Sequence, residues 1–331
     1  MIVTPALADA NNGNWRTARR WARMLAPAYR VQIVDRWDGG DDALMIALHA
    51  RRSAASVAAW RRDAGARPLL LVLTGTDLYR DVDGDAGARR SLELADALVV
   101  LNERGPLALP AALRPKCHVV LQSCTDRRPL PKTGSRLRSL MVGHLRAEKD
   151  PWTYWNAVRR LAARPDLRFE HVGAALDPVL GAEAAALAAA LPRFRWRGEI
   201  PHAAARRRIQ ASHLLVHPSR IEGGAHVVIE AIRSGTPVLA SAIDGNLGLL
   251  GDDYPGVFEP GDDRALAALI ERARDDPDML AGLSTRLAAR SPAFAPDAER
   301  AALRRLVATL MAGPCTGNPR WMQPNPLPSP G

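Results

Sequence analysis

The chain has 331 residues, more than a typical single domain, so two domains of ordinary size are expected. Its hydrophobic fraction of 47% is enough for folded cores, and its charged fraction of 24% suits a water-exposed surface. No apolar run approaches the roughly 18 residues that cross a bilayer, and the N-terminus shows no secretory signal. The cysteines Cys117, Cys124 and Cys315 form no disulfide framework and fit no metal site, so we expect a protein of the reducing cytoplasm.

The net charge of +10 would permit nucleic acid, an anionic membrane or small anions as partners. The arginines are spread along the chain among acidic residues, and together with heavy alanine use they are typical of a GC-rich coding bias. We therefore expect no nucleic-acid partner. Lysine is rare against this background, and Lys149 stands out beside only Lys116 and Lys132.

Short apolar runs rich in β-branched residues alternate with helical patterns along the chain. Continuous apolar strands separated by helices indicate parallel sheets that are buried on both faces. In the helix from Asn14, Ala18, Trp21 and Leu25 form one apolar stripe opposite a face of arginines. We expect a first series of strands at 2–6, 31–34, 43–48, 69–73, 97–101 and 119–121. We expect a second series at 139–143, 167–172, 194–196, 214–217 and 238–242.

A polar, proline-containing segment at 127–135 separates the two series and indicates a linker. The predicted fold is α/β, with two doubly wound, parallel-sheet (Rossmann-like) domains that face a shared cleft, because ligands bind beyond the carboxyl ends of such strands. The segment after Gly313 contains six prolines and is expected to be disordered. The predicted parts are an N-terminal domain over 1–128, a hinge over 129–136, a C-terminal domain over 137–292, a helix over 293–312 that packs back on the first domain, and a tail over 313–331.

The most informative stretch runs from His217 to Pro237, where a strand, a glycine-containing loop and a helix follow one another. Gly223 and Gly224 allow the backbone to approach a ligand and to point amide N–H groups at it. The start of the helix near Ala225 adds partial positive charge. A diphosphate group therefore fits this loop.

Two glutamates bracket the start of this helix, with Glu222 before it and Glu230 two turns inside it. Carboxylates suit sugar and ribose hydroxyls because they accept two hydrogen bonds side by side. A helix with an exposed acid at either end is the alternative interpretation. The stretch resembles the retaining family of GT-B glycosyltransferases that have two glutamates eight positions apart. The resemblance implies that Glu222 contacts the donor sugar and that Glu230 contacts the ribose of the nucleotide.

A second element follows the first strand of the C-terminal domain, from Met141 to Pro151. In the same family, an arginine after the glycine and a lysine five positions later neutralise the diphosphate. Lys149 matches the lysine, whereas His144 occupies the arginine position as either a neutral donor or a spacer. Arg146 is the candidate for the missing cation, and a surface salt bridge is the alternative interpretation of Lys149.

A loop is expected at 244–248, after the next strand. In similar enzymes this loop closes over the diphosphate or the sugar, which makes Gly245 and Asn246 candidate donor-binding residues. A simple turn is the alternative, because glycine and asparagine are common turn residues. No Asp-x-Asp metal signature lies at a donor strand end, so neither a metal nor another cofactor is expected.

Three polar clusters, at 11–14, 49–53 and 74–80, are predicted at the cleft edge of the N-terminal domain, where acceptor-binding groups are expected. The first opens a helix and forms a second anion-receptive site. Each cluster is also compatible with helix capping, for which Ser53 and Asp77 are suitable residues. The candidate acceptor-binding residues are Gly13, Asn14, His49, Arg51, Thr74, Gly75 and Thr76.

These clusters, together with 244–251 and 253–256, resemble the selenosugar synthases of selenoneine biosynthesis over nearly the whole chain up to Gly313. The resemblance implies a UDP-sugar donor, UDP-N-acetylglucosamine or UDP-glucose, and selenophosphate as the nucleophile. Such an anionic nucleophile needs no strong general base. The residues expected to carry catalysis are then Glu222, Lys149 and Arg146.

Two other classes are kept as alternatives. A cell-envelope glycosyltransferase with a hydroxyl acceptor would lie on a membrane surface. Trp21, however, sits on the apolar face of its helix in the manner of core packing, so we expect no membrane partner. A non-catalytic nucleic-acid-binding protein would show salt-dependent binding and no release of UDP.

Overall fold

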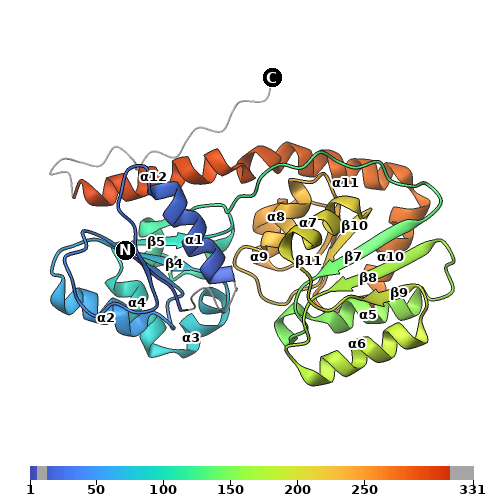
Figure 1. The fold of residues 1–331 in the computed structure, drawn as a ribbon, viewed down its shortest axis with the longest axis horizontal. Helices are drawn as coiled ribbons and strands as arrows, with labels where there is room; N and C mark the ends of the chain where they lie inside the picture. Colours follow the sequence, from blue (N-terminus) through green and yellow to red (C-terminus); the bar gives the residue numbers. More distant parts are fainter. Residues whose placement is uncertain (6–12, 314–331) are drawn as a thin grey trace.

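The computed structural model describes residues 1–5 and 13–313, which form two six-stranded parallel sheets (Figure 1). The first sheet has the strand order β2-β1-β3-β4-β5-β6. Its central strands β3 and β4 are buried along their whole length, as their continuous apolar sequences predict. The strands are β1 (Ile2–Val3), β2 (Ile33–Val34), β3 (Met45–Leu48), β4 (Leu69–Leu73), β5 (Ala97–Val100) and β6 (Cys117–Val119).

The second sheet has the strand order β12-β11-β10-β7-β8-β9, and all its neighbouring strands are parallel. The strand order of each sheet reverses beside its first strand, which is the doubly wound arrangement that the sequence predicts. Its strands are β7 (Leu137–Val142), β8 (Leu167–Val172), β9 (Phe194–Trp196), β10 (Leu214–His217), β11 (Val238–Ser241) and β12 (Val257–Phe258).

Helices cover both faces of each sheet, and within the described residues none is long and apolar enough to cross a membrane. The helices of the first domain are α1 (Gly13–Leu25), α2 (Ala54–Asp63), the π-helix η2 (Asp77–Asp81), α3 (Val82–Gly84), α4 (Ala86–Leu94), η3 (Gly105–Ala108) and η4 (Ala111–Lys116). Those of the second domain are η5 (Ala147–Lys149), α5 (Pro151–Arg160), α6 (Pro178–Ala190), α7 (His202–Ala211), α8 (His226–Ile232), α9 (Asp244–Leu250), α10 (Asp263–Asp275) and α11 (Pro277–Arg290). The last elements are η6 (Ser291–Phe294) and α12 (Pro296–Met311).

The C-terminal helix α12 lies along the top of the first domain in Figure 1 and packs against α1, while α11 lies along the second domain. Its apolar residues Leu303 and Val307 are buried in one cluster with Ile2 and Trp21. Trp21 is fully buried, and its indole N–H donates to the Glu299 carboxylate of α12 at 2.7 Å. The last helix of the chain therefore completes a core that the first residues begin.

Three local expectations differ from the structure. The last strand of the first series is β6 at 117–119, two residues earlier than the predicted run. Strand β12 was missed because its two apolar residues lie between a Pro-Gly and a Glu-Pro pair, so that no longer apolar run marks it in the sequence. The expected loop at 244–248 is the first part of helix α9. The proline-rich tail from 314 onward lies outside the described residues.

The segment between the two sheets follows the second domain closely. Arg127 N donates to Arg233 O at 2.9 Å, and the Gln210 side chain donates to Arg128 O at 2.7 Å. Figure 1 shows this segment running to the outer end of the second domain, where β7 begins. The hinge at 129–136 stays a prediction. Bending of the segment there would disturb the two contacts just described.

Candidate active site

A cleft of about 720 Å³ lies where the carboxyl ends of both sets of strands meet. From the second domain it is lined by Gly143 after β7, Gly173 after β8 and His217 at the end of β10. The position agrees with the rule that ligands bind beyond the carboxyl ends of parallel strands. The predicted site residues that line this cleft are Gly13, Asn14, His49, Thr74, Gly75, Thr76, His144, Arg146, Lys149, Glu222, Gly223, Gly224, Ala225 and Glu230.

Lys149 and Glu222 form an ion pair inside the cleft. His217 Nε2 lies 3.1 Å from the same carboxylate oxygen, Oε1 of Glu222. Burial alone would raise the pKa of the Glu222 carboxyl, but Lys149 and His217 hold that pKa well below its usual range. The carboxylate is therefore ionised, and the only lysine of the cleft is held beside it.

His144 and Arg146 lie beside this pair at the start of the same loop. His144 Nδ1 accepts a hydrogen bond from Ala174 N at 3.1 Å, so in the neutral ring Nε2 carries the proton. Burial, with smaller contributions from Arg146 and Lys149, lowers the pKa of His144. The geometry thus favours a neutral N–H donor at this position. The side chain of Arg146 makes no hydrogen bond or ion pair with any described residue, whereas its backbone carbonyl accepts from Lys149 N at 3.0 Å.

Glu230 is 2% exposed and lies between two histidines. Its Oε1 is 2.5 Å from His202 Nε2 at the start of α7 and 3.2 Å from His226 Nδ1 at the start of α8. Burial alone would raise the pKa of Glu230, but the two histidines lower it to about 2. The ligand atoms of these three residues lie within 4.8 Å of one another, so they could hold a metal ion. Arg206 Nε, 4.0 Å from the same oxygen, opposes a cation there.

The two glycines of the donor loop lie against the first domain as well as the cleft. A Cβ on Gly223 would overlap the carbonyl of Thr74, and a Cβ on Gly224 would lie 2.8 Å from Leu101 Cβ. Asn102 fixes this approach by donating from Nδ2 to Gly223 O at 2.7 Å. Close packing between the domains is therefore a reason for glycine that the sequence pattern alone did not indicate.

Gly245 and Asn246 do not line the cleft, because they belong to helix α9 behind the donor loop. A Cβ on Gly245 would overlap the Glu222 carbonyl, so this glycine lets α9 approach the loop. Asn246 is fully buried, and its Nδ2 donates to the Ser241 backbone and hydroxyl oxygens at 3.0 Å. Both residues thus contact the back of the donor loop or the strand beside it.

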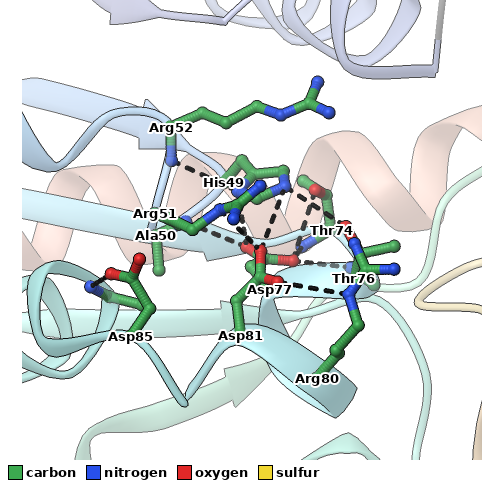
Figure 2. A network of polar contacts seen from close by, with 12 residues as sticks. His49, Ala50, Arg51, Arg52, Thr74, Thr76, Asp77, Arg80, Asp81 and Asp85 are labelled. Carbon is green, nitrogen blue, oxygen red and sulfur yellow. Dashed lines mark hydrogen bonds and ion pairs between the residues drawn. The ribbon is translucent and has the colours of Figure 1, made fainter. Parts of the chain in front are cut away.

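Figure 2 shows the polar network of the first domain around His49. His49 has a positive φ of 73°, an uncommon conformation for a residue other than glycine. Its Nε2 lies 3.2 Å from Thr76 Oγ1, and its Nδ1 accepts from Arg52 N at 3.4 Å. Burial lowers the pKa of His49, although Asp77 raises it. A neutral His49 therefore donates to Thr76, which leaves the Thr76 hydroxyl hydrogen free to donate to a ligand.

Asp77 ties the strand ends of this network together (Figure 2). Its carboxylate accepts backbone N–H groups from Ala50 at 2.9 Å, Thr74 at 2.9 Å and Gly75 at 2.8 Å. It is fully buried and is not a helix cap, which was the alternative interpretation of this cluster. Its contacts hold the two predicted acceptor loops side by side.

Arg51 does not line the cleft, whereas its neighbour Arg52 does. Arg51 Nε lies 3.2 Å from Asp81 Oδ2, and neither of these two residues lines the cleft. The strand end was located by its polar composition, but composition does not tell which of two consecutive arginines points inward.

The start of α1 brings Gly13 and Asn14 to the cleft, followed one and two turns later by Thr17 and Arg20. Arg20 is held by Glu299 of α12, with Nε 2.9 Å from Oε2. Its guanidinium also reaches within 3.5 Å of His226 Nε2 in the second domain. Its NH2 group is buried and has no hydrogen-bond partner among the described residues.

Several cleft residues were not predicted from the sequence. His226 carried a usable signal, because it precedes Glu230 by one helical turn. His202 and Arg20 reach the cleft through contacts with residues far away in the chain, which no local pattern reveals. The other unpredicted charged or histidine residues are Arg16, Arg52, Arg80, Glu148, Glu199 and His217.

Comparison with known proteins assigns the second domain to a family. A profile described as Glycosyl transferases group 1 matches residues 123–290, just over half of the chain. The chain is 27% identical over 316 residues to a D-inositol 3-phosphate glycosyltransferase from Streptomyces scabiei (strain 87.22). The match covers 94% of this chain but 60% of that protein, so the chain spans less than two thirds of its relative's length.

Solved structures share the whole two-domain arrangement. Sucrose-phosphate synthase from Thermosynechococcus elongatus matches with a TM-score of 0.67 at 21% identity, over 82% of this chain and 74% of that one. Anabaena HepE in complex with UDP and glucose matches with a TM-score of 0.66 at 17% identity, over 81% and 78% of the two chains. At these identities the likeness concerns the fold, and it confirms the predicted GT-B arrangement.

Proposed function

The chain belongs to the group 1 glycosyl transferases, and we propose that it transfers a sugar from a UDP-sugar to selenophosphate, giving a selenosugar, UDP and phosphate. The donor half of the proposal is supported by structures of the same fold that are described with UDP and glucose or with UDP-glucose. The acceptor half rests on the charge of the first-domain wall of the cleft.

That wall consists of basic and neutral groups. Among the described residues, the first domain lines the cleft with Arg16, Arg20, Arg52 and Arg80 and with no carboxylate. Arg20 is paired with Glu299, and Arg80 with Asp81 and Glu148, so the positive potential that favours an anion comes mainly from the other arginines of the wall. This distribution of charge is the observation that carries the acceptor proposal.

The nearby carboxylates of the first domain are already engaged. Asp77 accepts three backbone N–H groups, and Asp81 lies beside Arg51 and Arg80. No free carboxylate of this wall is thus placed to take a proton from an alcohol. An acceptor that is already an anionic nucleophile does not need one.

The proposed reaction proceeds in two balanced steps. The selenium of selenophosphate forms a bond to the anomeric carbon while the bond from that carbon to the UDP oxygen breaks, and UDP leaves with the electron pair. Water then cleaves the selenium–phosphorus bond and releases phosphate. Lys149, Arg146 and the amides of 223–225 are proposed to stabilise the charge that develops on UDP.

The remaining groups have proposed positioning roles. Glu222 and Glu230 contact sugar and ribose hydroxyls, and His144 donates from Nε2 to the donor. Gly13, Asn14 and Thr76 present hydrogen-bond donors to the phosphate of selenophosphate. We place the reaction in the cytoplasm, because the described cysteines, Cys117 and Cys124, are both free thiols.

A phosphorylated alcohol is the second candidate acceptor. It is favoured by the relative named D-inositol 3-phosphate glycosyltransferase, since the same arginine wall would hold such a phosphate. In this case a group in the cleft has to accept the hydroxyl proton. His49 is not available for this, because its Nδ1 already accepts from Arg52 N and its Nε2 donates to Thr76.

The deciding experiment incubates the protein with UDP-N-acetylglucosamine or UDP-glucose and one of four acceptors: selenophosphate, inositol 3-phosphate, a neutral sugar or a lipid-linked acceptor on vesicles. Release of UDP and the product mass are followed in each case. The proposal expects a selenosugar only with selenophosphate. Turnover with inositol 3-phosphate alone would assign the second candidate, and turnover only with a lipid-linked acceptor on vesicles would assign the cell-envelope class.

A further inference from the structure

A second cavity, of about 490 Å³, lies at the opposite edge of the second sheet from the cleft. It is lined by Arg138 near the start of β7, Arg168 near the start of β8 and Arg195 of β9, and by Thr133 and Arg136 of the interdomain segment. Figure 1 shows β7 and β8 pointing from this outer end toward the first domain. The cavity extends along the sheet as far as Glu170 in β8 and Arg197 after β9, and it shares no lining residue with the cleft. We call it the arginine cavity.

The lining of the arginine cavity carries seven arginines and one carboxylate, Glu170. Glu170 is already shared, since it accepts from Arg208 at 2.7 Å and 3.0 Å and lies 3.5 Å from Arg197. The side chains of Arg136 and Arg195 make no hydrogen bond or ion pair with any residue that the structure describes. Most of the positive charge is therefore not neutralised by the protein.

The arrangement places like charges next to one another. Arg138 and Arg168 are directly paired across β7 and β8, and like charges directly opposite in a sheet are destabilising. Arg138 also has a buried Nε without a hydrogen-bond partner among the described residues, although its other end donates to Ala211 O at 2.6 Å. Close by, burial and the charge of Arg138 lower the pKa of Lys132 to about 8. An anion in the cavity would offset the repulsion between the arginines and would offer a partner to the unpaired Nε of Arg138.

We infer that the arginine cavity binds a compact anion that carries two or more phosphate-type charges. Guanidinium groups suit this ligand because their planar N–H pairs bind phosphate oxygens two at a time. The volume falls within the range of pockets that enclose small molecules, roughly 300–1,000 Å³. The one aromatic residue of the lining, Phe169, is 3% exposed, so the cavity offers no surface on which nucleic-acid bases stack.

The test is titration of the protein with pyrophosphate, followed by calorimetry, with and without saturating UDP to fill the cleft. We expect pyrophosphate binding that persists in the presence of UDP. The double variant Arg136→Gln/Arg195→Gln should weaken that binding by about tenfold or more, which is the loss expected for one charge-assisted contact. The donor cleft is unaltered in this variant, so its affinity for UDP should not change.

A matched double variant, Arg62→Gln/Arg207→Gln, removes two exposed arginines outside both cavities and should bind pyrophosphate normally. An equal loss of affinity in this control would mean that pyrophosphate binding depends only on the net charge of the protein, and this would overturn the proposal. The absence of pyrophosphate binding in UDP-saturated protein would also overturn it. Binding of single-stranded DNA or anionic vesicles that is lost in the first variant, without pyrophosphate binding, would assign the arginines to a polymer or a membrane instead.

Discussion

Gly75 of the first domain and Gly223 of the second meet backbone to backbone across the cleft. A Cβ on Gly75 would lie 2.7 Å from Gly223 N, and the φ of Gly75 is +138°, a conformation that side chains rarely adopt. The contact joins the predicted acceptor loop directly to the predicted donor loop. Closure of the two domains at this point therefore requires glycine on both sides.

Gly75→Ala should hold the two domains apart. We expect kcat/KM to fall by about tenfold or more, because about 1.4 kcal/mol of lost closure corresponds to tenfold, and the radius of gyration measured by X-ray scattering with UDP should rise. Gly84→Ala is the control, since a Cβ there meets nothing within 4 Å. Scattering profiles with and without UDP that are identical for the native protein would argue against closure of the domains on UDP binding.

Lys149→Ala should reduce turnover by about 10²–10³, the range for removing one group that stabilises developing charge. The substitution also leaves Glu222 buried without its main counter-ion, which should raise the pKa of that carboxyl. Release of UDP is the assay, and circular dichroism checks the fold. Lys116→Ala is the matched control, because that lysine hydrogen-bonds carbonyls of the first domain outside the cleft. Similar rates for both variants would contradict the placement of the donor site.

Arg52→Gln and Arg51→Gln test the acceptor wall at adjacent positions. Arg52 lines the cleft, whereas Arg51 lies against Asp81. We expect Arg52→Gln to raise the KM for the anionic acceptor about tenfold, the effect of one charge-assisted hydrogen bond, without changing the KM for the UDP-sugar. Arg51→Gln should leave both values near those of the native protein. The reverse order would restore Arg51 as the acceptor-binding residue that the sequence suggested.

Ionisation of Glu230 makes the free energy of unfolding depend on pH. Its pKa is about 2 in the folded protein against a model-peptide value of 4.5, so the carboxylate stabilises the fold fully above about pH 4.5 and progressively less down to about pH 2. Glu230→Gln should lower Tm at pH 7, by roughly 2–4 °C for each kcal/mol lost. The difference from the native protein should shrink as the pH falls from 4.5 to 3. A constant difference over that range in thermal melts would contradict the assigned pKa.

Glu299→Gln tests the link between the last helix and the cleft. The Glu299 carboxylate accepts from Arg20, Trp21 and both the backbone N–H and the hydroxyl of Ser123. The amide cannot accept all of these donors, and each buried group left unpaired costs about 1–3 kcal/mol. We expect a lower Tm and a higher KM for the acceptor, because Arg20 lines the cleft. Glu183→Gln, at an exposed pair with Arg159, should leave both unchanged.

The sequence was informative wherever a function or an element depends on nearby residues. The buried parallel strands follow from apolar runs, and two motifs, each at the end of a strand, pointed to Lys149 and Glu222 as residues of one site. Their ion pair was not predicted. The helix at 244–250 was mistaken for a loop because its glycines and asparagine are turn residues, and here they serve the close approach of α9 to the Glu222 carbonyl. Tertiary contact, which local composition does not contain, decided the conformation.

The residues that the sequence missed are those brought together by the fold. His202 and Glu230 are 28 positions apart, and Arg20 and Glu299 are 279 apart. A single sequence contains no record of such pairs. For Arg51 and Arg52 the sequence located the correct strand end. It did not give the direction of each side chain, because this turn begins with the positive φ of His49, which local composition does not predict.

The packing of α12 on α1 has a consequence for the order in which the chain folds during synthesis. The first sheet is translated first, but the outer side of α1 and the Trp21 indole are covered by Leu303, Val307 and Glu299. The ribosome must therefore release nearly the entire chain before this first-made domain can be completed. The buried core of the second domain runs from Cys124 to Phe294, so it too needs most of the chain, but it is complete before α12 begins at Pro296.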